Sequence, residues 1–119
     1  MGDREDRKAR NEAVFRTLNE RIRAVVDELS LAGIVDEREV SEYLCECAAA
    51  DCLERIMLTP AEYELARATP IRFVIAPGHV AVEVERVVHE TDRFMIVEKH
   101  PGERQIAAAT DPRREQPGE

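Results

Sequence analysis

The chain has 119 residues, of which 44% are apolar and 4% aromatic, and its 17 basic and 25 acidic side chains give a net charge of −8. This length fits one domain with a modest core, and the acidic charge argues against nucleic-acid binding because phosphate groups would be repelled. No apolar run is long enough to cross a bilayer, and the charged N-terminus lacks the apolar stretch of a signal peptide. We therefore expect a cytoplasmic protein without a membrane segment.

A long amphipathic helix is predicted for residues 6–33, after a disordered stretch of residues 1–5. Apolar residues recur at intervals of three and four in the rhythm of a helix seam: Phe15, Leu18, Ile22, Val25, Leu29 and Ala32. Gly33 follows, at a position where glycine commonly ends a helix. Two interpretations of this apolar stripe remain open. Either it packs on the protein's own sheet, or it pairs with another helix in a second copy or a partner.

The charge is distributed unevenly between this helix and the rest of the chain. Residues 1–32 carry seven basic and seven acidic side chains, whereas residues 33–119 carry ten basic and eighteen acidic ones. The whole excess of negative charge therefore lies outside the helix. We expect the chain to bind a protein partner, or to associate with itself, through this N-terminal helix.

Residues 34–100 are predicted to form a zinc-binding α+β domain. Short strands on both sides of the cysteine segment would place the cysteines on a knuckle between them. One helix through residues 37–57 is the alternative, since alanine and glutamate are common there. Further along, Thr59 and Glu62 form a capping box, and Pro70 ends the helix that they begin.

Three more strands are predicted after this helix, at residues 71–75, 80–90 and 93–99. The second alternates apolar and polar residues until Val87 and Val88 break the phase, which predicts a bulge. The third is apolar on both faces, which is typical of a central strand. The fold class is therefore α+β: a long N-terminal helix, a small antiparallel sheet of about five strands, and one short helix. Residues 101–119 are rich in proline, glycine and charge, and we expect a flexible tail.

All three cysteines of the chain, Cys45, Cys47 and Cys52, occur within eight positions, in the spacing C-x-C-x4-C. In a reducing compartment, clustered cysteines favour metal ligation over disulfides. Zinc takes four ligands in a tetrahedron, and the alanines at 48–50 are small enough for a tight turn between the sulfur atoms. We therefore predict a structural zinc site with three thiolate ligands and one ligand from elsewhere.

His79 is the predicted fourth ligand, because the preceding Pro77-Gly78 pair makes a sharp turn and leaves the next side chain at the edge of a loop. Carboxylates suit zinc less well than imidazole beside three soft thiolates. The alternatives are a water molecule or one of the following side chains: Glu46, Asp51, His89 and His100.

The cysteines also have interpretations without zinc. Free cysteines are often buried as small apolar residues, and a redox role would need a disulfide that leaves one thiol over. An iron–sulfur cluster usually takes four cysteines. A fourth interpretation pairs Cys52 with His79 as a nucleophile and its base, although no group to orient the base can be recognised.

Two resemblances are carried by these motifs. The spacing of Cys45, Cys47 and Cys52 resembles the post-SET motif of histone lysine methyltransferases, which binds a structural zinc with a fourth ligand from elsewhere in the protein. The chain is too short for a SET domain, so the resemblance implies zinc and no methyltransferase activity. The segments "NEAVFRTLNERI", "CECAAADC", "LTPAEYELARATP" and "APGH" are together similar to a family of small uncharacterised bacterial proteins. That likeness covers most of residues 11–99 and implies a single-domain cytoplasmic protein without an established activity.

The sequence thus predicts a small zinc-stabilised protein-interaction or regulatory module, with a structural site formed by Cys45, Cys47, Cys52 and His79. The alternative is a small metal-dependent or thiol-dependent enzyme that uses the cysteine cluster and His79.

Overall fold

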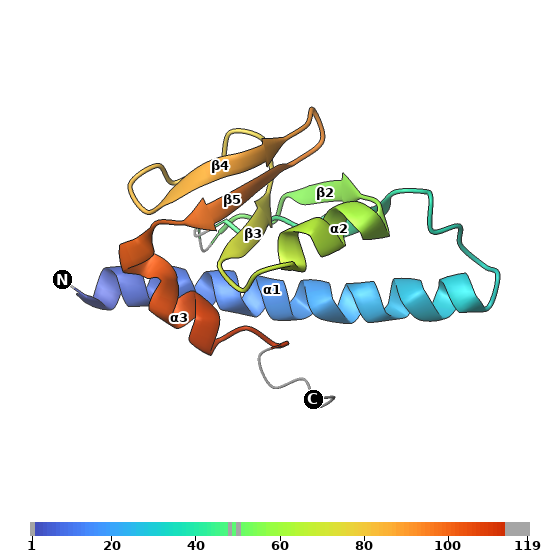
Figure 1. Cartoon of the computed structure of the whole chain (residues 1–119), viewed down its shortest axis with the longest axis horizontal. Helices are drawn as coiled ribbons and strands as arrows, with labels where there is room; N and C mark the ends of the chain where they lie inside the picture. Colours follow the sequence, from blue (N-terminus) through green and yellow to red (C-terminus); the bar gives the residue numbers. More distant parts are fainter. Residues whose placement is uncertain (1, 48, 50, 114–119) are drawn as a thin grey trace.

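The computed structural model describes residues 2–47, 49 and 51–113. One long helix lies along one side of the molecule, and two small sheets and a short helix lie together on its other side (Figure 1). The elements in chain order are α1 (Gly2–Leu31), β1 (Ser41–Leu44), β2 (Arg55–Leu58), α2 (Pro60–Arg67), β3 (Arg72–Ile75), β4 (Glu85–Glu90), β5 (Met95–Lys99), a 3₁₀ helix η1 (Pro101–Glu103) and α3 (Arg104–Ala109). This arrangement confirms the predicted α+β class. Within the described part of the chain, no helix combines the length and the apolar character needed to cross a membrane.

The five strands form two antiparallel sheets and not the single sheet that the sequence predicts. β1 pairs with β2, and β5 lies between β3 and β4 in the second sheet, which confirms β5 as a central strand. The apolar core lies where the inner faces of the two sheets meet α2. Its largest fully buried apolar and aromatic side chains are Tyr43, Leu58, Tyr63, Phe73, Ile75, Phe94 and Ile96.

The strand predicted at residues 80–90 begins only at Glu85. A turn precedes it, in which the Glu85 carboxylate accepts a hydrogen bond from the Ala81 N–H at 2.9 Å. Period-2 alternation alone does not reveal this side-chain contact with the backbone. The pairing with β5 shifts register between Val87 and His89, which confirms the predicted bulge.

The start of α2 follows the predicted capping chemistry. The Thr59 hydroxyl accepts a hydrogen bond from the Glu62 N–H at 3.2 Å, and the Glu62 carboxylate accepts one from the Thr59 N–H at 2.8 Å. Pro60 occupies the first turn, where a missing N–H costs nothing. These local bonds satisfy the backbone donors that a helix leaves free at its start.

The face of α1 that packs against the domain combines polar and apolar side chains, so only part of the predicted stripe packs on the protein's own domain. Glu12, Arg16 and Asn19 are buried on this face. Ile22 packs against the core and Val26 beside it is buried, whereas Val25 of the predicted stripe remains 52% exposed. Helical periodicity identifies a stripe, but it does not show which face finds partners in the fold.

Two buried side chains of α1 attach the helix to the backbone of other elements. The Arg16 guanidinium donates to the carbonyl oxygens of Pro70 at 2.6 Å and Ala107 at 2.7 Å. The Asn19 amide donates to the Leu44 carbonyl at 2.8 Å and accepts from the Leu44 N–H at 2.8 Å. Asn19 thus pairs with β1 as a neighbouring strand would. Since these backbone groups are withdrawn from water, their partners on α1 hold the helix in one position.

A third attachment is a buried ion cluster. The Lys99 ammonium lies 2.7 Å from a carboxylate oxygen of Glu12 and 3.0 Å from one of Glu85. Burial raises the pKa of the Glu12 carboxyl from 4.5 to about 7, although Lys99 opposes that shift. The cost of desolvating Glu12 therefore exceeds what its contact with the lysine returns.

The segment predicted as a flexible tail is ordered through residue 113, and the prediction is wrong for this part. η1 and α3 follow β5, and Arg67 and Asp111 form a buried ion pair beyond them. The Arg113 guanidinium contacts Glu20 at 2.6 Å and Glu64 at 2.8 Å. Composition alone could not reveal these partners, because they lie far away in the sequence. Residues 114–119 of the predicted tail lie outside the described residues.

The start of the chain differs from the prediction as well. α1 begins at Gly2, so the stretch predicted to be disordered at residues 1–5 belongs to the helix from its second residue onward. Residue 1 lies outside the described residues.

Replacing Asn19 should test the polar attachment of α1. We expect Asn19→Ala to lower the free energy of unfolding by about 2–4 kcal/mol, because it leaves the buried N–H and carbonyl of Leu44 without partners. Urea unfolding followed by circular dichroism measures the change. Asp27→Ala, at an exposed position on the same helix, is the control. An equal effect of the two substitutions would contradict this role of Asn19.

The raised pKa of Glu12 predicts a pH dependence. The folded state holds a proton on Glu12 up to about pH 7, whereas the unfolded state releases it near 4.5. Relative to Glu12→Gln, the wild type should therefore lose stability as the pH rises from 4.5 to about 7, and the difference should stay constant above that. Urea unfolding of both proteins at several pH values measures this difference. Glu83→Gln, at an exposed position, controls for the loss of one negative charge, and a wild-type advantage that grows with pH would contradict the prediction.

Candidate metal centre

The three cysteines lie in the segment between β1 and the antiparallel β2, which confirms the knuckle and rules out the alternative of one helix through residues 37–57. The Cys45 N–H donates to the Glu54 carbonyl at 2.9 Å and so extends the pairing of the two strands by one step. The Cys52 N–H donates to the Ala49 carbonyl at 3.2 Å, which closes the turn. The pairing of β1 with β2 therefore fixes both ends of the loop that carries the cysteines.

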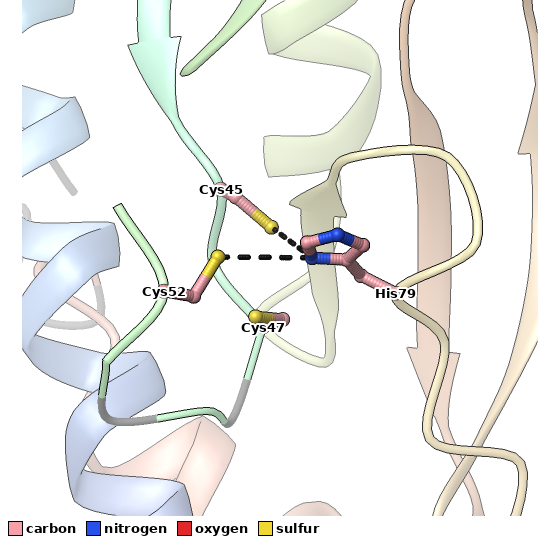
Figure 2. A group of neighbouring side chains, drawn as sticks. All are labelled: Cys45, Cys47, Cys52 and His79. Atoms are coloured by element: carbon pink, nitrogen blue, oxygen red, sulfur yellow. Dashed lines mark hydrogen bonds between the residues drawn. The ribbon is translucent and has the colours of Figure 1, made fainter. Parts of the chain in front are cut away.

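His79 reaches the knuckle through a tight turn after β3. Its N–H donates to the Ala76 carbonyl at 3.1 Å, and Gly78 has a φ of 85°. Proline at the second position and glycine with positive φ at the third are the residues that a type II turn requires. The turn brings the imidazole beside the three sulfur atoms (Figure 2).

The four predicted ligand residues come together in the structure. His79 Nδ1 lies 3.5 Å from Cys45 Sγ and 3.7 Å from Cys52 Sγ, as the dashed lines in Figure 2 show. No two of the four ligand atoms, including Cys47 Sγ, are more than 4.8 Å apart. Cys45 and Cys47 are buried, whereas Cys52 and His79 are partly exposed. This arrangement can hold one metal ion at its centre.

The other candidates for the fourth ligand lie elsewhere among the described residues. His89 is exposed on β4, where its ring lies 5.8 Å from that of Phe94. His100 follows β5, and its N–H donates to the Val84 carbonyl at 2.8 Å. Asp51 is exposed on the knuckle. None of these side chains belongs to the cluster that the structure forms.

Burial dominates the electrostatics of the cluster. Burial raises the pKa of the Cys45 and Cys47 thiols, because a thiolate loses its hydration there. The Ala76 N–H offsets part of this cost by donating to Cys45 Sγ at 3.2 Å. All three cysteines are free, so no disulfide uses their sulfur atoms. A divalent metal would supply the positive charge that lets buried thiols ionise.

Glu46 supports the knuckle from the side opposite the metal ligands, and sequence reasoning considered it only as a poor ligand. Its carboxylate accepts from the Val74 N–H at 3.0 Å and from the Asn19 amide at 2.7 Å. Its own N–H donates to the Val74 carbonyl at 2.7 Å. Glu46 therefore joins the knuckle to β3. Burial raises the pKa of its carboxyl to about 7, opposed by these hydrogen bonds.

The sequence contains a signal that could have identified Glu46. In an extended C-E-C segment, the middle side chain points away from the two cysteines and therefore towards the interior of the domain. Asn19 gives a weaker signal, because asparagine in the middle of a helix usually has a specific hydrogen-bonding role.

One side of the cluster faces solvent. Cys52 and His79 border an open hollow of about 620 Å³, which is also lined by Ala49, Asp51, Leu53, Glu54 and Arg55. This hollow gives an ion a path to the ligands, while Cys45 and Cys47 close the inner side.

No protein-family model, curated protein or solved structure matches this chain. The two resemblances given by its motifs therefore stay predictions. What the chain does has to be inferred from its own residues and their geometry.

Replacing Glu46 should weaken metal binding although Glu46 is not a ligand. We expect Glu46→Ala to lower the affinity for zinc by about 10–100-fold, because the knuckle loses its attachment to β3 and α1. Competition with a chromophoric chelator measures the affinity. Glu42→Ala, at an exposed position on β1, is the control. Equal affinities of the two variants would contradict the supporting role of Glu46.

Proposed function

We propose that this chain is a small zinc-binding protein with a structural metal site formed by Cys45, Cys47, Cys52 and His79. The observation that carries the proposal is the convergence of one imidazole nitrogen on two sulfur atoms, at 3.5 and 3.7 Å. Bonds of about 2.3 Å to sulfur and about 2.05 Å to nitrogen, at tetrahedral angles, place the two atoms about 3.6 Å apart. The side chains therefore already lie near the positions that tetrahedral zinc requires.

Zinc fits the donor set better than other common metals. Three soft thiolates and one imidazole are typical of tetrahedral zinc, whereas calcium and magnesium take oxygen ligands. Two thiolates on one zinc ion lie about 3.8 Å apart. The ligand atoms here are at most 4.8 Å apart, so the most distant pair would move together by about 1 Å when zinc binds. Four protein ligands leave no position for water, which is the mark of a structural site.

The metal would join parts of the chain that are distant in sequence. Cys45 and His79 are 34 positions apart, and they belong to segments that leave two different sheets. Zinc binding would thus fix the β1–β2 sheet against the β3–β5–β4 sheet. Because the site forms only in the folded chain, the free energy of binding becomes free energy of folding.

We further propose that the zinc-stabilised domain acts as a protein-interaction or regulatory module in the cytoplasm, where free thiols persist. The exposed apolar side chains of α1 support this role, and the charge of −8 argues against a nucleic-acid partner.

Metal analysis tests the site directly. Protein purified without added zinc should carry one zinc ion per chain by native mass spectrometry, and removal by a chelator should lower the thermal midpoint strongly. Cys45→Ser and His79→Ala should lose most of the metal, because each removes one of the four ligands. His89→Ala, an exposed histidine outside the cluster, should keep it.

One observation favours the alternative, a small metal-dependent or thiol-dependent enzyme. Cys52 Sγ lies 3.7 Å from His79 Nδ1 at the edge of the open hollow. A thiol nucleophile and the histidine that serves as its base are placed side by side in this way. Metal-free protein whose Cys52 is alkylated rapidly, and slowly in His79→Ala, would support this enzyme and contradict the structural site.

A further inference from the structure

The outer face of α1 carries a line of apolar side chains, although Ile22 and Val26 on the other face pack against the domain. With 100° per residue, Val14, Leu18 and Val25 fall on one line along the helix, opposite the buried Arg16 and half-buried Arg23. Val14 is 55% exposed and Val25 is 52% exposed. Exposed apolar side chains that line up on one helix face are a candidate surface for a partner.

The surface has a shape as well as apolar character. A hollow of about 350 Å³ lies beside the line, and it is lined by Ala13, Val14, Thr17, Leu18, Arg21 and Thr110. Thr110, at the end of α3, forms one wall, and α1 forms the rest. Figure 1 shows the two sheets and α2 together on one side of α1, and the exposure of Val14 and Val25 shows that none of these elements covers them.

Two exposed charges border the apolar line on the same flank. Arg10 and Glu28 are 18 residues apart, which is five full helical turns or about 27 Å. Both are exposed, and neither forms an ion pair with the side chains that the structure describes, those of residues 10–47, 49 and 51–113. One end of the surface is therefore positive and the other is negative.

The distribution of charge along the chain favours α1 as the surface at which a second copy would bind. Residues 1–32 are balanced, with seven basic and seven acidic side chains, while the rest of the chain carries the charge of −8. Two copies that meet along α1 bring neutral surfaces together and keep their acidic parts apart.

We propose that α1 binds a second copy of this chain in an antiparallel dimer with two-fold symmetry. A two-fold axis perpendicular to both helices reverses their direction and places like flanks side by side. With the axis near residue 19, Arg10 faces Glu28 of the partner subunit, and the symmetry repeats this pair at the other end. Val14 then lies close to the partner's Val25. A parallel pair would place like charges together and is disfavoured.

The test is the oligomeric state of the full chain over a series of concentrations, measured by native mass spectrometry and by light scattering after gel filtration. The wild type should form a dimer. Arg10→Glu and Glu28→Arg should each raise the dissociation constant by on the order of tenfold or more, because each creates two repulsive pairs. The double variant should restore the dimer, and an equimolar mixture of the single variants should form mainly the mixed dimer.

Two further variants separate the surface from general effects of charge. Val25→Glu should weaken the dimer to a similar extent, whereas Val82→Glu, at a position 66% exposed in a loop, should not. All these positions are exposed, so the circular dichroism spectra should stay the same. A wild-type chain that remains monomeric would overturn the proposal and leave the surface to a different protein. A dimer that the single charge reversals do not weaken would overturn it too.

Discussion

The hydrogen bonds of Asn19 and Glu46 to neighbouring backbone are the interactions on which the rest of the structure depends. Asn19 takes the place of a strand beside Leu44, and Glu46 does the same beside Val74. Both side chains are buried, so each bond replaces one that water would otherwise make. Together they attach the knuckle to α1 and to β3. Because side chains alternate along an extended chain, Glu46 points into the domain while its neighbouring cysteines point towards His79.

The polar side chains on the inner face of α1 have a consequence for its outer face. Arg16, Asn19 and the pair of Glu12 with Lys99 hold the helix through hydrogen bonds and buried ions. Some apolar residues of the helix, such as Val14 and Val25, are therefore free to face outward. The proposed metal site and the proposed dimer surface lie on opposite sides of the same helix, and Asn19 connects the helix to the knuckle. A small domain with few aromatic residues would thus gain stability from a metal and from a second copy.

The parts of the structure that the sequence predicts correctly depend on neighbours in the chain. The capping box of Thr59 and Glu62 involves residues three positions apart, and the turn at Pro77 and Gly78 is set by their own backbone preferences. The spacing of the cysteines predicts the knuckle for the same reason, since a short loop between paired strands keeps its ends together. Even the prediction of His79 rests on the turn that precedes it. The sequence does not show that this turn lies beside the cysteines.

The sequence by itself determined the α+β class, the short helix with its caps, the bulge in β4 and the residues of the candidate metal centre. Only the tertiary structure decided which face of α1 is buried, because periodicity reveals a stripe but not the backbone groups that Arg16 and Asn19 satisfy. It also decided the division into two sheets, where Glu46 bridges strands that do not pair directly. The order of the C-terminal segment depends on Asp111 meeting Arg67, which is 44 positions away. Contacts between distant residues form only when the whole chain has folded, so local patterns do not encode them.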